Sequence, residues 1–206
     1  MHLTAAPLKI QIQARLQQLD GRLPPRWLPS SHLTGAPAGA WRSWLQEQGS
    51  LTLRLQSQAR QGFRVRVLSE GVSRVHPQEA QLLQAASHRV WVRQVLLEVD
   101  DQPWVFARSL LPLDDRGLLR RRILQVGNRA LGHILFSDPL IERGPLMFCA
   151  PGQLPFDSLW GRASCFYGEH LRLLVAEHYL QPMAERLALP TLPYYATALM
   201  QGVTPS

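Results

Sequence analysis

Two arginines and one glutamate lie in otherwise apolar rows of predicted strands. Alternating apolar residues, bounded by turn residues, predict strands over residues 89–99, 103–111 and 171–180. Successive side chains of a strand point to opposite faces, so Arg93, Arg108 and Glu177 each share a face with Val, Leu or Phe neighbours. Charged side chains on apolar faces need a partner. Guanidinium groups bind carboxylates, and a carboxylate can hold or remove a proton.

The turn between the first two strands determines how the two arginines face each other. If Asp100-Asp101 forms a two-residue hairpin turn, Arg93 lies directly opposite Arg108. Like charges in that position are destabilising, so an anion is expected beside them. That anion is either Glu177, in a structural ion-pair network, or a bound ligand in a closed pocket. Both interpretations are open on the residues alone.

Other catalytic patterns find little support in the sequence. It has no GxxxxGK[ST] or GxGxxG segment for a nucleotide and no HExxH motif for a metal. The seven histidines are scattered, and Cys149 and Cys165 have no CxxC spacing. We therefore predict neither a metal nor an organic cofactor.

The chain is basic, and its positive charge is spread along the sequence. The net charge is +7, and Lys9 is the only lysine, so almost all of the positive charge is arginine spread along the chain. One cluster, Arg116 with Arg120–Arg122, follows Asp114 and Asp115 and fits a short solvated helix with a complemented dipole. An anion or nucleic-acid patch is the alternative there. No specific nucleic-acid partner is predicted.

Membrane and secretory segments are not expected. No apolar run approaches the ~20 residues of a membrane span. Polar and charged residues interrupt the first 16 positions, where a signal peptide needs a continuous apolar stretch. With only two cysteines, a cytoplasmic, monomeric protein with reduced thiols is the simplest prediction.

The order of elements predicts one antiparallel α+β domain with extensions. Helices and strands mix without a βαβ rhythm, and at least one hairpin is evident. We divide the chain into an N-terminal helix and Pro/Ser/Gly-rich arm (1–39), a main domain (40–182) and a C-terminal extension (183–206). The expected helices are Leu8–Leu19, Trp41–Gln48, Gln78–Ala85, Arg116–Gln125, Ala130–Leu135 and Tyr194–Met200, and further strands are expected at Leu51–Leu55, Phe63–Val75 and Ser164–Tyr167.

Four ordered blocks resemble the bacterial chorismate pyruvate-lyase family, and the similarity runs from Trp41 to Pro182. The closing strand matches in its apolar pattern and in Glu177. No single block is diagnostic, but their order and spacing together are specific. The blocks are Ser50-Leu51-Thr52 with Arg54, Trp91–Leu97 through Gln102-Pro103-Trp104 to Ala107-Arg108-Ser109, Leu131-Gly132 with Leu135-Phe136, and Leu159–Ser164.

The resemblance implies a fold and a set of site residues. The fold is a cofactor-free, six-stranded antiparallel sheet with helices packed on it and flaps that close over an internal ligand pocket. The product-binding glutamate corresponds to Glu177 and the essential arginine to Arg93. The backbone amides of Leu51 and Leu131 would meet the ligand carboxylate, and Arg108 would be the second pocket arginine.

The resemblance also implies a reaction, the elimination of pyruvate from chorismate to give 4-hydroxybenzoate for ubiquinone biosynthesis. A non-catalytic module related to the effector domains of bacterial transcription regulators is the alternative. Against it, residues 1–39 are too short and too rich in proline for a DNA-binding domain. Two features depart from the family pattern: Asp100-Asp101 replaces the usual Asp-Gly at the hairpin, and the tail after Met183 extends past the usual end.

Overall fold

The structure is a computed structural model that describes residues 8–18, 27–29, 31, 39–114, 117–151 and 158–191. Its elements follow one another as α1 (Leu8–Gln18), β1 (Leu28–Pro29), α2 (Ala40–Leu45), α3 (Leu51–Gln58), β2 (Phe63–Arg74), α4 (Pro77–Leu82), β3 (Arg89–Val99), β4 (Gln102–Leu111), α5 (Leu118–Leu124), α6 (Gly132–Ser137), β5 (Glu142–Arg143), β6 (Met147–Cys149), β7 (Ser158–Gly168), β8 (Leu171–Leu180) and α7 (Gln181–Leu187). The predicted α+β class is confirmed.

One antiparallel sheet organises the described part of the chain. Its strands follow the order β1-β6-β7-β8-β4-β3-β2, and β5 pairs with β7 beside that path. The sheet has eight strands where six were expected. The difference comes from short strands, because β1 and β5 have two residues each and β6 has three.

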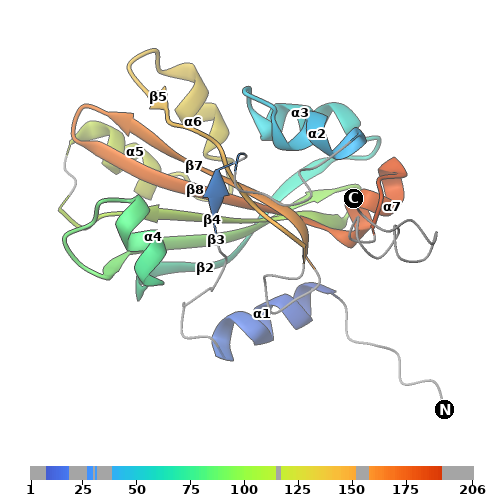
Figure 1. The fold of residues 1–206 in the computed structure, drawn as a ribbon, viewed down its shortest axis with the longest axis horizontal. Helices are drawn as coiled ribbons and strands as arrows, with labels where there is room; N and C mark the ends of the chain where they lie inside the picture. The colour runs from blue at the N-terminus through green and yellow to red at the C-terminus, as the bar shows by residue number, and fades with distance from the viewer. Residues whose placement is uncertain are drawn as a thin grey trace.

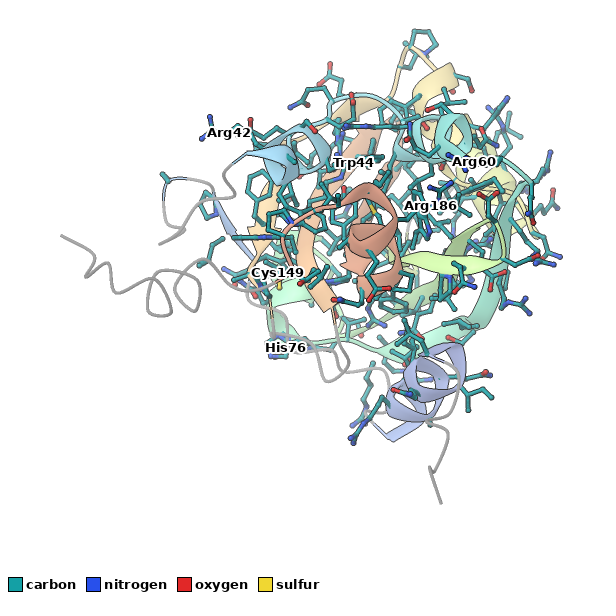
Figure 2. The ribbon with its side chains drawn as sticks, turned by 90° about the vertical axis from the view of Figure 1, so that its right-hand side faces the viewer. Arg42, Trp44, Arg60, His76, Cys149 and Arg186 are labelled. Carbon is teal, nitrogen blue, oxygen red and sulfur yellow. The ribbon has the colours of Figure 1, made fainter. Side chains whose placement is uncertain are left out.

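Helices cover both faces of the sheet. In Figure 1, α2, α3 and α6 lie on one side and α1 and α4 on the other. Seen end-on, α2 directs Trp44 towards the sheet while α1 lies across the opposite face (Figure 2). The α1 residues Ile12 and Leu16 are buried against Leu96 and Phe106, which explains the apolar spacing of this helix. We call the side of α2, α3 and α6 the front face.

A β-bulge in β4 changes the predicted register of the β3–β4 hairpin. Val99 pairs with Gln102 as expected, but the register shifts next to Glu98, and Trp104 has no partner on β3. Arg93 therefore pairs with Ser109, and Arg108 pairs with Gln94. Because one extra residue reverses the face of every later side chain, the prediction that Arg93 lies opposite Arg108 is wrong.

The Asp100-Asp101 turn forms without the usual glycine. Both residues have positive φ, 49° and 61°, a region that Asp tolerates better than most residues. The Asp100 carboxylate accepts hydrogen bonds from the backbone N–H groups of Arg60, Gln61 and Gly62, at 2.7 to 3.2 Å. The turn thereby anchors the loop between α3 and β2.

Local predictions failed at two further places. The alternating residues Leu51–Leu55 form the first part of α3 rather than a strand, and the Ser50 hydroxyl accepts a hydrogen bond from the Leu53 N–H as its N-cap. The sequence reading also missed α7, which buries Met183 and Ala184. The predicted helix at Tyr194–Met200 lies outside the described residues.

Candidate active site

A cavity lies on the front face between the sheet and the helices α3 and α6. Its volume is about 50 Å³. Leu51, Arg93, Leu131 and Glu177 all line it, so four of the five predicted site residues come together, from α3, β3, the start of α6 and β8. Val95, Leu97, Ala107 and Val175 form an apolar floor beneath these polar groups.

Arg93 is buried in the cavity wall, with a side chain only 2% exposed. Its Nη1 donates to Glu70 Oε2 at 2.9 Å, and Glu70 is its direct neighbour on β2. Its Nη2 donates to the backbone oxygens of Gly127 and Arg129, at 2.6 and 3.2 Å. Burial lowers the pKa of Arg93, while Glu70 opposes that change. Arg93 thus couples the sheet to the loop that leads into α6.

Glu177 faces Arg162 rather than either predicted arginine. The two residues are partners in the β7–β8 register, and Arg162 Nε donates to Glu177 Oε2 at 2.6 Å. Arg162 Nη1 also donates to the backbone oxygens of Trp44 and Glu47. Burial lowers the pKa of Arg162, but Glu177 and its neighbours outweigh that effect and the net pKa is raised. The arrangement holds the carboxylate at the cavity wall.

Arg108 does not join this group, because the Trp104 bulge turns it to the back face. There its Nε donates to Glu79 Oε1 at 2.9 Å, and both side chains are 1% exposed. Arg108 also lines a separate hollow of about 320 Å³ near α1 and the middle of β2. The structure gives it the position of a buried ion-pair residue.

The backbone amides at Leu51 and Leu131 lie at the starts of the two helices over the cavity. Leu51 is the first residue of α3 and Leu131 the residue before α6. Within the described chain, no hydrogen-bond partner is seen for either N–H. The two helices approach closely here, since a Cβ added to Gly132 would come within 2.8 Å of Ser50 Oγ. Both amides are thus available to a cavity ligand.

A larger hollow of about 690 Å³ adjoins the cavity between α3 and α6. The two spaces share lining residues, namely Thr52, Val65, Arg129, Ala130, Gly132 and Phe136. The hollow therefore continues the cavity towards α3 and the residues before α6. This is the position expected for flaps over an internal ligand pocket.

Sequence reasoning missed three arginines that line the cavity, namely the exposed Arg129 and the more buried Arg143 and Arg162. Strand parity places Arg162 on one face with Ser164 and Phe166, a pattern like the one that singled out Glu177. Arg143 had no comparable pattern, because its strand has only two residues. Tertiary structure alone brings it to the site.

The described ranges hold neither a candidate metal site nor a candidate membrane-spanning helix. No group of three or more His, Cys, Asp or Glu side chains there is arranged to hold a metal ion. None of the helices described is long and apolar enough to cross a membrane.

The amino-acid sequence matches one known family over most of its length. The family model described as chorismate lyase matches residues 24–187. The probable chorismate pyruvate-lyase of Chromohalobacter salexigens is 39% identical over 176 residues, covering 81% of this chain and 94% of the relative. That of Pseudomonas aeruginosa is 39% identical over 164 residues, covering 75% and 90%. The chain belongs to the chorismate lyase family.

Among solved structures, PhnF from Mycobacterium smegmatis is similar with a TM-score of 0.47 and 13% identity over 66% of each chain. The ligand-binding domain of a putative GntR-family regulator from Bordetella bronchiseptica has a TM-score of 0.39 and 16% identity, covering 58% of this chain and 83% of that one. The domain boundaries near residues 39 and 182 stay predictions.

Proposed function

We propose that this protein eliminates pyruvate from chorismate to give 4-hydroxybenzoate, as an early step of ubiquinone biosynthesis. The observation that carries the proposal is the cavity itself, in which a buried arginine and a glutamate face an apolar floor beneath two helix starts. In a member of this family, such a lining offers a cation for the carboxylate of a small aromatic acid, an acceptor for its hydroxyl and an apolar surface for its ring. The expectations of a cytoplasmic monomer without a cofactor stay predictions.

In this reaction the enolpyruvyl C–O bond breaks, and the adjacent ring carbon, which carries the hydroxyl, loses its proton. The ring becomes aromatic, and the departing enolpyruvyl group gains a proton to become pyruvate. Because aromatisation makes the step strongly downhill, the protein has mainly to orient and polarise the substrate. The proton passes either to Glu177 or directly to the leaving group.

Arg93 and the amides of Leu51 and Leu131 would bind the ring carboxylate. Arg93 would neutralise the carboxylate charge, and the two N–H groups would donate hydrogen bonds to its oxygens. Glu177, positioned by Arg162, would accept a hydrogen bond from the ring hydroxyl at the other end. Closure of α3 and α6 over the cavity would exclude water and strengthen each of these contacts.

The same closure would also retain an aromatic product. A flat, apolar ring matches the floor of Val95, Leu97 and Val175, and its carboxylate and hydroxyl would keep the contacts that bind the substrate. We therefore propose that product release limits turnover.

The test is an assay that measures both products at once. Purified protein is incubated with chorismate, with and without a chelator, and pyruvate and 4-hydroxybenzoate are quantified in the same stopped samples. We expect equal amounts of the two products in both conditions. The appearance of 3-hydroxybenzoate or salicylate, or unchanged chorismate, would refute the assignment. Binding of 4-hydroxybenzoate without turnover would favour the effector-binding alternative.

Arg93→Ala tests whether this arginine binds the ligand. Ligand binding stabilises the wild-type protein by RT ln(1 + [L]/Kd), about 2.7 kcal/mol at a hundredfold excess of ligand over Kd. The variant should lose activity and most of the thermal shift with 4-hydroxybenzoate. An unchanged shift would remove Arg93 from the binding site.

A further inference from the structure

The ionic groups of the cavity leave two arginines without a carboxylate, and one of them is half-buried. Arg93 is paired with Glu70 at 2.9 Å, and Arg162 with Glu177 at 2.6 Å. Arg129 and Arg143 also line the cavity, and no carboxylate lies within ion-pairing distance of either in the described parts of the chain. Arg129 is exposed, and its Nε donates to the backbone oxygen of Val126 at 3.4 Å, whereas Arg143 is half-buried. The cavity wall therefore carries an excess positive charge, and the part of it that is shielded from solvent is located on Arg143.

Neutral groups hold the Arg143 side chain in place. Its Nε donates to the hydroxyl of Ser164 at 2.8 Å, and its Nη1 donates to the backbone oxygens of Glu47 and Gln48, each at 3.2 Å. Nη2 has no hydrogen-bond partner among the residues that the structure describes. One edge of the guanidinium group is thus fixed, and Nη2 on its other side is available to a ligand.

Two aromatic rings lie beside the guanidinium group of Arg143. The guanidinium carbon lies 5.5 Å from the centre of the Phe166 ring and 5.9 Å from that of Phe136, and both rings also line the cavity. Ring faces attract a cation without neutralising it. Burial lowers the pKa of Arg143, and the nearby charge of Arg162 lowers it further. The group is oriented and desolvated, which makes it a strong binding site for an anion.

We propose that Arg143 binds a second carboxylate of the substrate, the one on its enolpyruvyl group. The inference deepens the proposed function and depends on it. Arg93 and the two helix-start amides serve the ring carboxylate, and Glu177 serves the hydroxyl. A dianionic substrate then places its ring carboxylate at Arg93 and its enolpyruvyl carboxylate at Arg143. Arg108 is excluded from this role by its position on the back face.

On this assignment, Arg143 distinguishes the substrate from the aromatic product. Chorismate carries two carboxylates, whereas 4-hydroxybenzoate retains only the ring carboxylate. Elimination therefore releases pyruvate with the carboxylate that Arg143 holds, and the aromatic product leaves Arg143 without an anion. Arg143 should contribute to substrate affinity and contribute almost nothing to product affinity.

The experiment compares Arg143→Gln and Arg143→Lys with the wild type. For each protein, kcat/KM is measured with chorismate, and the competitive inhibition constant is measured with 4-hydroxybenzoate. Arg143→Gln should lower kcat/KM by roughly a hundredfold, the loss expected for a charge-assisted hydrogen bond to a carboxylate. The inhibition constant should stay within about twofold. Arg143→Lys retains the charge and should recover part of the loss.

Arg122→Gln is the control, because Arg122 is half exposed, has only a long contact of 3.8 Å with Asp138 and does not line the cavity. It should leave both constants unchanged. If 4-hydroxybenzoate raises the melting temperature of Arg143→Gln as much as that of the wild type, the variant is folded. If Arg143→Gln does not fold, the KM of Arg143→Lys for chorismate provides the test. Unchanged kcat/KM, or a parallel loss of product binding, overturns the proposal. Absence of turnover by the wild type would instead refute the proposed function.

Discussion

Arg162 and Glu177 face each other on neighbouring strands, and Arg162 Nε donates to the Glu177 carboxylate at 2.6 Å. The same guanidinium group donates to the backbone oxygens of Trp44 and Glu47, at the end of α2 and just beyond it. One buried side chain therefore fixes the carboxylate of the cavity and the helix that packs over it. This arrangement positions Glu177 as a hydrogen-bond acceptor.

Glu177→Gln distinguishes the two roles that this carboxylate can have. The amide keeps the shape and still offers an oxygen to a ligand hydroxyl, but it cannot remove a proton. We expect an orienting role, so that 4-hydroxybenzoate binding stays near normal and kcat falls less than about tenfold. Titration of product and steady-state kinetics measure both effects. A loss of the roughly 10²–10⁴-fold typical of a general base, with product binding intact, would contradict this expectation.

Arg162→Gln should reduce the stability of the fold strongly. Removing one partner of a buried ion pair leaves its counter-ion uncompensated, which typically costs about 3–5 kcal/mol. Arg162 is 1% exposed and Glu177 15%, so most of that cost should appear in urea unfolding. Arg122→Gln, from an exposed pair, should cost less than about 1 kcal/mol. Similar losses for the two variants would show that the buried pair contributes little.

The pair of Arg108 and Glu79 provides a second buried ion pair, on the back face. We predict that Arg108→Met lowers the free energy of unfolding by about 3–5 kcal/mol, because Glu79 stays buried without its cation. The double variant Arg108→Met/Glu79→Leu should recover most of the loss. The thermal shift with 4-hydroxybenzoate should persist in the double variant. Loss of this thermal shift would indicate that Arg108 contributes to ligand binding.

His178 should make the fold sensitive to acid. Its ring contacts those of Trp27 and Phe106, and both ring nitrogens lack hydrogen-bond partners among the described residues. Burial together with Arg108 lowers its pKa to about 3. A lowered pKa means that its contribution is complete above the unfolded value near 6.5 and is lost as the pH falls towards 3. The slope is at most about 1.4 kcal/mol per pH unit from this group.

His178→Leu isolates that contribution, since leucine does not titrate. Unfolding free energies of both proteins are measured from pH 7 down to pH 4. The difference between them should change in favour of the variant as the pH falls. Parallel pH dependences would show that His178 does not cause the acid sensitivity.

Side-chain alternation was sufficient to predict most of the sheet and two of the polar residues in the cavity. The strands around Arg93 and Glu177 have long apolar rows, and a charge in such a row is visible without any tertiary information. The N-terminal helix was also predictable from a local pattern, because its apolar residues Ile12 and Leu16 repeat at helical spacing. Such patterns are local, and local physics decides them.

The face on which Arg108 lies and the position of Arg143 in the cavity wall depend on non-local features. A bulge at Trp104 reverses the face of Arg108; Pro103 directly before it is a residue found at bulges, but it does not determine which residue stays unpaired. Leu51–Leu55 alternates like a strand, yet the Ser50 cap and the burial of Leu51 and Leu55 favour a helix. Arg143 reaches the cavity only through the pairing of a two-residue strand with β7. Pairing and packing across the sheet determined each of these outcomes.

Gly161→Ala should destabilise the sheet at the point where β7 passes His178. An added Cβ would come within 2.7 Å of His178 Nδ1 and 3.3 Å of Cys149 Cβ, and Gly161 and His178 are partners in the register. Because the buried ring has little room to move, we expect a loss of about 1–3 kcal/mol, the range for overpacking in a core. Gly62→Ala is the matched control, since nothing lies within 4 Å of its added Cβ, and its effect should stay below about 1 kcal/mol. Urea unfolding of the three proteins measures the difference, and equal midpoints for Gly161→Ala and the wild type would show that His178 can rotate away.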